Sequence, residues 1–250
     1  MSHISAQFRS DRSETIKNDA SEHTLATFNR EPYKSSDGKV ANGYLATINI
    51  LFLGNSLTIT GVPEEESDKD HERGLTSTRI ENDYVHLLLQ MISEKKKVNI
   101  NYTVMNIADF ERNFSRVLFD KSQLSNILVK KPDYVIFQIG ENVSRKDITQ
   151  NGSLFEQRYS DMIKVFSSAT KIVCLPFWPD KDKIAHIKNV ALANGTHLVD
   201  LSHLGSGMDP KNFASSFRKY SQSVVGSHPG DYGMKNIADN IFTVFNATMK

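Results

Sequence analysis

The sequence predicts an α/β fold in which helices cover both faces of a parallel β-sheet of about five strands. Apolar, β-rich runs of strand length recur along the chain, and segments with helical spacing of apolar residues alternate with them. The runs are apolar throughout, as is typical of strands buried on both faces. We predict strands at residues 45–53, 98–105, 134–139, 171–175 and, more weakly, 196–200, with helices at 83–92, around 155–166, 183–193 and 234–245.

The length of 250 residues suits one α/β domain with a full core. Residues 1–45 are rich in Ser, Asn, Asp, Lys and Glu, a composition that does not bury a core unaided. We therefore expect a polar N-terminal arm over 1–45, extended or poorly ordered, and a single domain over 46–250.

Charge and hydropathy exclude two classes of partner. The formal net charge is +1, so the protein has no global field that would attract nucleic acid. No run approaches the roughly 18 apolar residues of a membrane span, and the first residues lack the pattern of an export signal. We expect no nucleic-acid partner, no membrane span and a cytoplasmic location, and the oligomeric state stays open. The single cysteine, Cys174, lies in an apolar run and is expected to be a buried hydrophobe.

Ligands of parallel α/β sheets bind at the carboxyl ends of the strands, so the residues after each strand are the candidates for a site. The first predicted strand is followed by Gly54-Asn55-Ser56-Leu57-Thr58. A serine at such a turn can project its hydroxyl clear of the sheet, and a helix start after it would offer free N–H groups to an oxyanion. The alternative is that Ser56 only caps a helix.

Two further strand-end segments carry chemistry that complements a serine. The third strand is followed by Gly140-Glu141-Asn142, where glycine permits close approach of the backbone and the amide of Asn142 can donate to an oxyanion. His228 lies in a loop constrained by Pro229 and Gly230, directly before the last helix, where it can act as a base toward a serine. Each segment alone also fits an ordinary turn or a solvated histidine, but the joint pattern is far less expected by chance.

The three segments, in this order, resemble the conserved blocks of the SGNH/GDSL hydrolases. Gly54-Asn55-Ser56-Leu57-Thr58 resembles the serine block in a variant with Asn in place of the name-giving Asp. Gly140-Glu141-Asn142 is similar to the block with the oxyanion asparagine, and His228-Pro229 to the block with the catalytic histidine. The sequence segments 81–88, 110–113 and 228–234 further resemble those of an uncharacterised bacterial subgroup of this family.

The resemblance implies a flavodoxin-like three-layer α/β/α sandwich that cleaves acyl esters with no cofactor and no metal ion. Ser56 would attack the carbonyl carbon, and His228 would take the serine proton and return it to the leaving alcohol. The backbone N–H of Ser56 and the side-chain amide of Asn142 would bind the oxyanion. The substrate would be a small-molecule or glycan ester.

Two positions depart from the family pattern. The usual aspartate three residues before the histidine is Val225 here, so we expect Asp200 or Asp231 to orient His228, with a backbone carbonyl or a Ser–His dyad as alternatives. The family's oxyanion glycine is also missing, and Ala108 is the nearest candidate because its backbone N–H can serve equally.

Residues around these segments are candidates for substrate binding. An arginine on the rim can clamp a substrate carboxylate or phosphate, and a structural ion pair is an alternative at least as strong. An aromatic ring at a strand end can stack on a sugar or cap the core. The candidates are Asn55, Glu111, Arg112, Gly140, Glu141 and Trp178.

Three functions compete on this sequence. The preferred hypothesis is an ester hydrolase that acts on an acyl ester, for example an acetyl group on a carbohydrate. An acyltransferase would use the same groups with a sugar hydroxyl in place of water. A non-catalytic module that binds a glycan or a partner is the third, and Val225 is the residue that supports it.

Overall fold

The computed structural model describes residues 46–60, 73–116, 124, 128–129 and 131–249, together with the backbone of β1 (Phe28–Asn29). The predicted polar arm of residues 1–45 otherwise lies outside the described residues. Within the described part of the chain, no helix is long and apolar enough to cross a membrane.

A single sheet of six strands forms the centre of the domain, in the order β1-β3-β2-β4-β5-β6. The last five pair in parallel, and β1 adds an antiparallel edge against β3. This confirms the predicted parallel sheet of about five strands. The parallel strands are β2 (Thr47–Gly54), β3 (Asn99–Asn106), β4 (Tyr134–Gln138), β5 (Thr170–Cys174) and β6 (His197–Val199).

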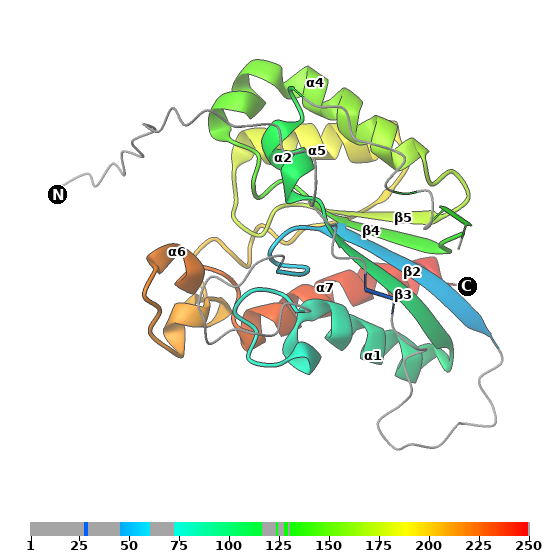
Figure 1. The fold of residues 1–250 in the computed structure, drawn as a ribbon, viewed down its shortest axis with the longest axis horizontal. Helices are drawn as coiled ribbons and strands as arrows, with labels where there is room; N and C mark the ends of the chain where they lie inside the picture. The colour runs from blue at the N-terminus through cyan, green and yellow to red at the C-terminus, as the bar shows by residue number, and fades with distance from the viewer. Residues whose placement is uncertain are drawn as a thin grey trace, which may run out of the picture.

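Helices cover both faces of the sheet and make three layers (Figure 1). One face carries α1 (Tyr84–Lys96) and α7 (Asp231–Thr248), and the other carries α2 (Ala108–Asn113), α4 (Arg145–Lys164) and α5 (Lys181–Ala193). Shorter turns complete the described chain: η1 (Ile80–Asn82), η3 (Pro210–Asn212), η4 (Ala214–Ser216) and α6 (Ser223–Gly226).

The helix α4 begins ten residues before the predicted segment, and α2 was not predicted. The first half of α4 is polar and gives no apolar period, but Ser144 caps it by accepting a hydrogen bond from the Asp147 N–H at 3.0 Å. The helix α2 spans six residues, too few for a periodic pattern to stand out.

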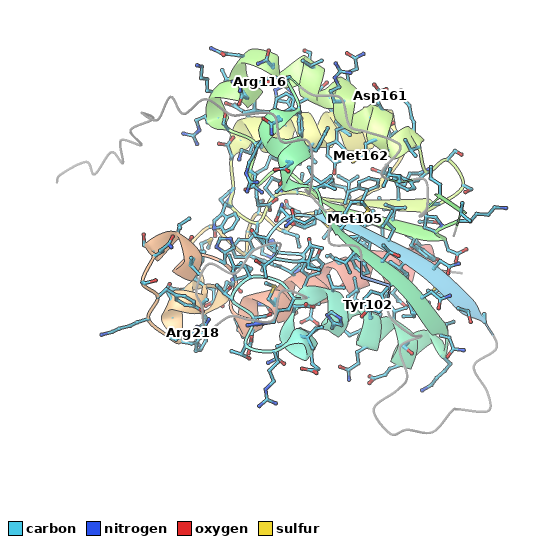
Figure 2. The ribbon with its side chains drawn as sticks, in the orientation of Figure 1. Tyr102, Met105, Arg116, Asp161, Met162 and Arg218 are labelled. Carbon is cyan, nitrogen blue, oxygen red and sulfur yellow. The ribbon has the colours of Figure 1, made fainter. Side chains whose placement is uncertain are left out.

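Side chains of β2 point alternately into two apolar clusters, one on each face of the sheet. Ile50 and Phe52 face the cluster under α1 and α7, whereas Leu51 and Leu53 face the cluster under α4 and α5. All four are at most 2% exposed. Burial on both faces explains why these strands are apolar throughout. Met105 of β3 and Met162 of α4 belong to the second cluster (Figure 2).

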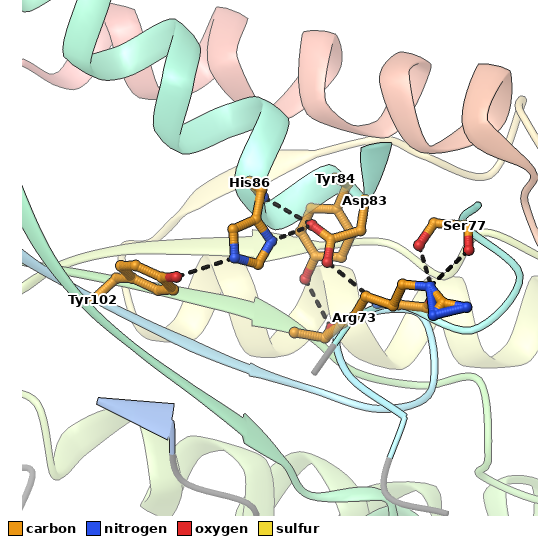
Figure 3. Close-up of polar contacts among 8 residues, drawn as sticks. Arg73, Ser77, Asp83, Tyr84, His86 and Tyr102 are labelled. Atoms are coloured by element: carbon orange, nitrogen blue, oxygen red, sulfur yellow. Dashed lines mark hydrogen bonds and ion pairs between the residues drawn. The ribbon is translucent and has the colours of Figure 1, made fainter. Parts of the chain in front are cut away.

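A polar network fastens the segment 73–83 to the first helix and to β3 (Figure 3). Asp83 caps α1 by accepting a hydrogen bond from the His86 N–H at 2.8 Å, and it also accepts from the Gly74 N–H at 3.3 Å. The His86 ring lies between an Asp83 carboxylate oxygen at 2.8 Å and the Tyr102 hydroxyl at 3.0 Å. This segment, which contacts the histidine loop described below, therefore has a fixed position.

Candidate active site

Ser56 lies in a tight turn directly after β2. The Thr58 N–H donates to the Asn55 carbonyl at 2.9 Å, and the Thr58 hydroxyl lies 2.8 Å from the Tyr84 hydroxyl of α1. Gly54 is required here, because a Cβ at this position would lie 1.9 Å from Thr58 Oγ1. The serine is half-buried in a turn and caps no helix, so the expected helix start directly after it is wrong.

The structure brings His228 to Ser56 across 172 residues of sequence. Nε2 of His228 lies 3.1 Å from the Ser56 hydroxyl oxygen, and Nδ1 lies 2.9 Å from the backbone carbonyl oxygen of Val224. A carbonyl oxygen only accepts hydrogen bonds, so Nδ1 carries the proton in this arrangement. The lone pair of Nε2 in the neutral ring then faces the serine hydroxyl, as a general base requires.

Several contacts fix the loop that carries His228. The Thr76 hydroxyl donates to the Pro229 carbonyl at 3.0 Å, and the Ala214 N–H donates to the His228 carbonyl at 2.9 Å. The Trp178 ring meets the imidazole edge-on, with centroids 5.0 Å apart, and its indole N–H donates to the Ser227 carbonyl at 3.2 Å. Trp178 thus packs both against the histidine and against the apolar cluster under α1 and α7, which agrees with the expectation that it caps the core.

The two carboxylates expected to orient His228 bind elsewhere, which corrects that prediction. Asp200 accepts from the N–H and the hydroxyl of Ser202, at 2.9 and 2.6 Å. Asp231 accepts from the N–H and the hydroxyl of Thr78, at 2.8 and 2.6 Å, and ties that segment to the start of α7. The Val224 carbonyl occupies the orienting position, one of the alternatives that the sequence left open.

Two of the three expected oxyanion donors have an N–H to offer. Among the described residues, none accepts a hydrogen bond from the Ser56 N–H. The Asn142 amide gives one N–H to a Glu111 carboxylate oxygen at 2.6 Å, which leaves its second N–H for a ligand. The Ala108 N–H donates to the Asn106 side-chain oxygen at 3.0 Å, so the proposed part of Ala108 in the oxyanion hole is corrected.

Three residues expected to bind substrate instead form a buried network beneath the site. The amide nitrogen of Asn55 donates to a carboxylate oxygen of Glu111 at 3.2 Å and to one of Glu141 at 3.0 Å. Asn55 and Glu111 are fully buried, and the Glu141 carboxylate also accepts from Gln138 and from the Phe177 N–H. These side chains face the interior and do not face a ligand, because their polar atoms are already paired.

The glycine of the same loop holds a conformation that other residues rarely adopt. Gly140 has φ of 134°, and a Cβ there would lie 2.9 Å from both Ile187 and Pro176. Its N–H donates to Glu111 at 2.5 Å. Gly140 therefore shapes the turn that carries Asn142.

Burial without a direct cationic partner raises the pKa of both glutamates. For Glu111 the pKa rises to about 7, because burial disfavours the charged form and Glu141 adds repulsion, while the N–H donors of Gly140, Asn142 and Asn55 oppose the shift. For Glu141 the pKa is also raised, chiefly by burial. The ammonium group of Lys183 donates to the Glu141 backbone carbonyl at 3.1 Å and not to its carboxylate.

Arg112 is the exposed cation beside the site. Its guanidinium donates to the Asn142 side-chain oxygen at 3.3 Å and pairs with Asp109 at 3.4 Å. Its side chain is 55% exposed, so it remains accessible to a ligand. The pairing with Asp109 agrees with the structural ion pair that the sequence left open for Arg112.

A hollow of about 540 Å³ lies beside the histidine loop, on the lobe that carries η3, η4 and α6. Arg218, labelled in Figure 2, forms part of the wall of this hollow. Its guanidinium carbon lies 4.5 Å from the centroid of the Tyr220 ring. Ser227, directly before His228, also lines the hollow. Among the described residues, no group of three or more His, Cys, Asp or Glu side chains is placed to hold a metal ion.

No protein-family model matches the sequence, and no curated protein matches it. Solved structures do match. The lipase/acylhydrolase from Enterococcus faecalis superposes with a TM-score of 0.56 at 18% identity, covering 81% of this chain and 97% of the other. A protein from Parabacteroides merdae described as a GDSL-like lipase superposes with a TM-score of 0.53 at 16% identity, covering 82% and 98%. The chain has the SGNH/GDSL hydrolase fold.

A third similar structure is the acetyl xylan esterase AlAXEase, with a TM-score of 0.51 at 18% identity over 78% of this chain and 98% of the other. These matches agree with the resemblance of the three sequence blocks and confirm the expected three-layer fold. At such identity they show the fold alone.

Sequence reasoning left a backbone carbonyl open as the orienting group but did not identify that of Val224, and it missed the inward direction of the two glutamates. A backbone carbonyl carries no residue signature, since any amino acid offers one. The glutamates had a weak signal: two acids near a Gly-Asn-Ser turn, in which the carboxylate of the family's name-giving motif is replaced by an amide.

Proposed function

We propose that this protein is a serine esterase that hydrolyses acyl esters, with carbohydrate-borne acetyl esters as the expected substrate class. The observation that carries the proposal is the hydrogen-bonded line from the Val224 carbonyl through His228 to the Ser56 hydroxyl, at 2.9 and 3.1 Å. A neutral histidine held in this tautomer beside a serine is the arrangement that nucleophilic catalysis needs.

The proposed reaction begins when Ser56 Oγ attacks the ester carbonyl carbon while Nε2 of His228 takes the hydroxyl proton. The carbonyl oxygen gains negative charge and binds to the Ser56 N–H and the free N–H of Asn142. Collapse of this intermediate breaks the bond to the alcohol oxygen, which receives the proton from His228. Water then attacks the acyl-enzyme by the same route, releasing the acid and restoring Ser56.

The structures that share this fold support a carbohydrate substrate. An acetyl xylan esterase and a two-domain esterase active on acetylated mannans are among the structures that share this fold. The hollow beside His228 has a volume of about 540 Å³, within the usual range of small-molecule sites. We place the alcohol part of the substrate there.

The test is hydrolysis of p-nitrophenyl acetate and acetylated xylan by the wild type, Ser56→Ala and His228→Ala, with a fluorophosphonate label located by mass spectrometry. We expect the label on Ser56 and a loss of roughly 10⁴-fold or more in kcat for each variant, as for other serine nucleophiles and their bases. A wild type that neither turns over nor labels above the Ser56→Ala background would leave a non-catalytic glycan-binding module as the better description.

Acyl transfer is separated from hydrolysis by product analysis with and without a sugar acceptor. Hydrolysis yields free acetate at a rate independent of the acceptor. An acetylated acceptor that forms at the expense of acetate would identify a transferase with the same catalytic groups.

A further inference from the structure

We infer that Glu111 is a positioning residue for the oxyanion hole, holding Asn142 and its loop through a buried Asn55–Glu111–Glu141 network. This inference rests on the proposed function of Ser56 and Asn142. It assigns to a buried acid a part in catalysis that needs no contact with substrate.

The hydrogen bonds of Glu111 are the first observation behind this inference. One carboxylate oxygen accepts the Asn142 amide at 2.6 Å, and the other accepts the Gly140 N–H at 2.5 Å. The same side chain thus binds the loop before the proposed oxyanion donor and the donor itself. A bidentate acceptor at this point fixes the direction of the remaining Asn142 N–H.

The register of the sheet explains why the network around Glu111 extends to the turn that carries Ser56. In the parallel register, Leu53 of β2 is opposite Met105 of β3 and Phe137 of β4, so the three strands end at one edge. Asn55 then bridges the ends by donating to Glu111, to Glu141 and to the Gln138 carbonyl at 3.2 Å.

The network also gives a reason for asparagine at position 55. Its side-chain nitrogen donates to both carboxylates, while its oxygen accepts the Leu57 N–H at 3.1 Å. An aspartate would replace a shared donor with a third acid between two buried acids. Around them, Lys183 donates to the Glu141 backbone and Arg112 to the Asn142 oxygen, so neither cation binds a carboxylate of the pair directly.

The experiment is a double-mutant cycle between Glu111→Gln and Asn142→Ala, with kcat and KM measured on p-nitrophenyl acetate. Loss of an oxyanion donor costs about 10²–10³ in kcat, so we expect that range for Asn142→Ala. For Glu111→Gln we expect a fall on the order of 10-fold in kcat with KM within about twofold, because the effect arises in the transition state. Added to Asn142→Ala, Glu111→Gln should lower kcat no further.

Equal factors for Glu111→Gln in both backgrounds, or unchanged kcat in the wild-type background, would overturn the inference. The control is Glu94→Gln on the exposed face of α1, which should match the wild type. Should Glu111→Gln not fold, Asn55→Asp combined with Glu111→Gln restores a donor and an acceptor between the two positions. We expect this pair to recover kcat relative to Asn55→Asp alone, and no recovery would count against the network.

A readout without turnover separates this inference from the proposed function. In a ¹⁵N spectrum assigned with Asn142→Ala, the Asn142 side-chain proton that is bonded to Glu111 should exchange slowly in the wild type and faster in Glu111→Gln. Unchanged exchange overturns the positioning role even in an active enzyme. A wild type with a protected Asn142 amide and no esterase activity would instead defeat the proposed function and keep the contact.

Discussion

At the scale of single residues, His228, the proposed general base, is oriented by a neutral carbonyl in place of a carboxylate. The Val224 carbonyl fixes the tautomer of His228, but it offers less stabilisation than an anion to the imidazolium that forms during attack. The neighbouring Val225, at the position of the family's aspartate, is only 4% exposed and belongs to the interior. The loop therefore supplies the acceptor from its backbone.

The first prediction concerns Asp200 and Asp231, the two aspartates that the sequence offered as the third member of a catalytic triad. We expect Asp200→Ala and Asp231→Asn to keep kcat within about threefold of the wild type. Asp231→Asn should lower the free energy of unfolding by roughly 1–2 kcal/mol, because charged hydrogen bonds to Thr78 at a helix N-terminus are weakened. Ester hydrolysis and urea denaturation on the same samples check both. A 10⁴-fold loss of kcat in either variant would instead show that the mutated aspartate orients His228 in a carboxylate triad.

At the scale of elements, the proposed catalytic groups come from three loops that follow β2, β4 and α6. Each loop is fastened by a hydrogen bond that does not involve the reacting atoms: Thr58 to Tyr84, Gly140 to Glu111, and Pro229 to Thr76. Such fastening holds the groups in place before substrate arrives, which is what electrostatic catalysis requires.

The β4–α4 loop offers a direct test of this fastening. Gly140→Ala forces a Cβ into contact with Ile187 and Pro176 at a φ of 134°, so we expect a loss of stability of about 2–4 kcal/mol and a clear fall in kcat. Gly195→Ala is the matched control, because its φ of 58° is also positive while no atom lies within 4 Å of the added Cβ. It should cost only about 1 kcal/mol and leave kcat unchanged. Equal effects of both substitutions would refute the role of the loop.

At the scale of the whole molecule, the buried acid pair links folding to pH. The pKa of Glu111 is about 7 when folded, above the value near 4.3 of an unfolded glutamate, so the folded state binds this proton more tightly. The contribution to stability is fully present below about pH 4.3 and is lost as the pH rises toward and through 7.

We therefore expect Glu111→Gln to flatten the pH dependence of unfolding. Between about pH 5 and pH 8 the wild type should lose up to roughly 3 kcal/mol relative to the variant, since one pKa unit corresponds to about 1.4 kcal/mol. Urea denaturation of both proteins across this range measures the difference. Parallel curves for the two proteins would show that Glu111 titrates alike in the folded and unfolded chains.

Much of the fold follows from local patterns in the sequence. The runs at 45–53 and 134–139 became β2 and β4 because strands buried on both faces must be apolar throughout. The residues directly after those runs, Ser56 and Asn142, were identified because strand ends share one edge of a parallel sheet. The helix α2, the start of α4 and the short elements β1, η1, η3, η4 and α6 were not predicted, because none of them carries a readable apolar period.

The sequence by itself determined the order of strands and helices and the chemical types gathered at the strand ends, because these depend on local composition and periodicity. The tertiary structure alone decided which atom orients His228 and which way the side chains of Asn55, Glu111 and Glu141 point. The first outcome depends on the local backbone conformation that turns the Val224 carbonyl toward His228, and the second on polar groups paired between loops that are distant in the sequence. A buried carboxylate and a solvated one have the same letter in the sequence, and only packing distinguishes them.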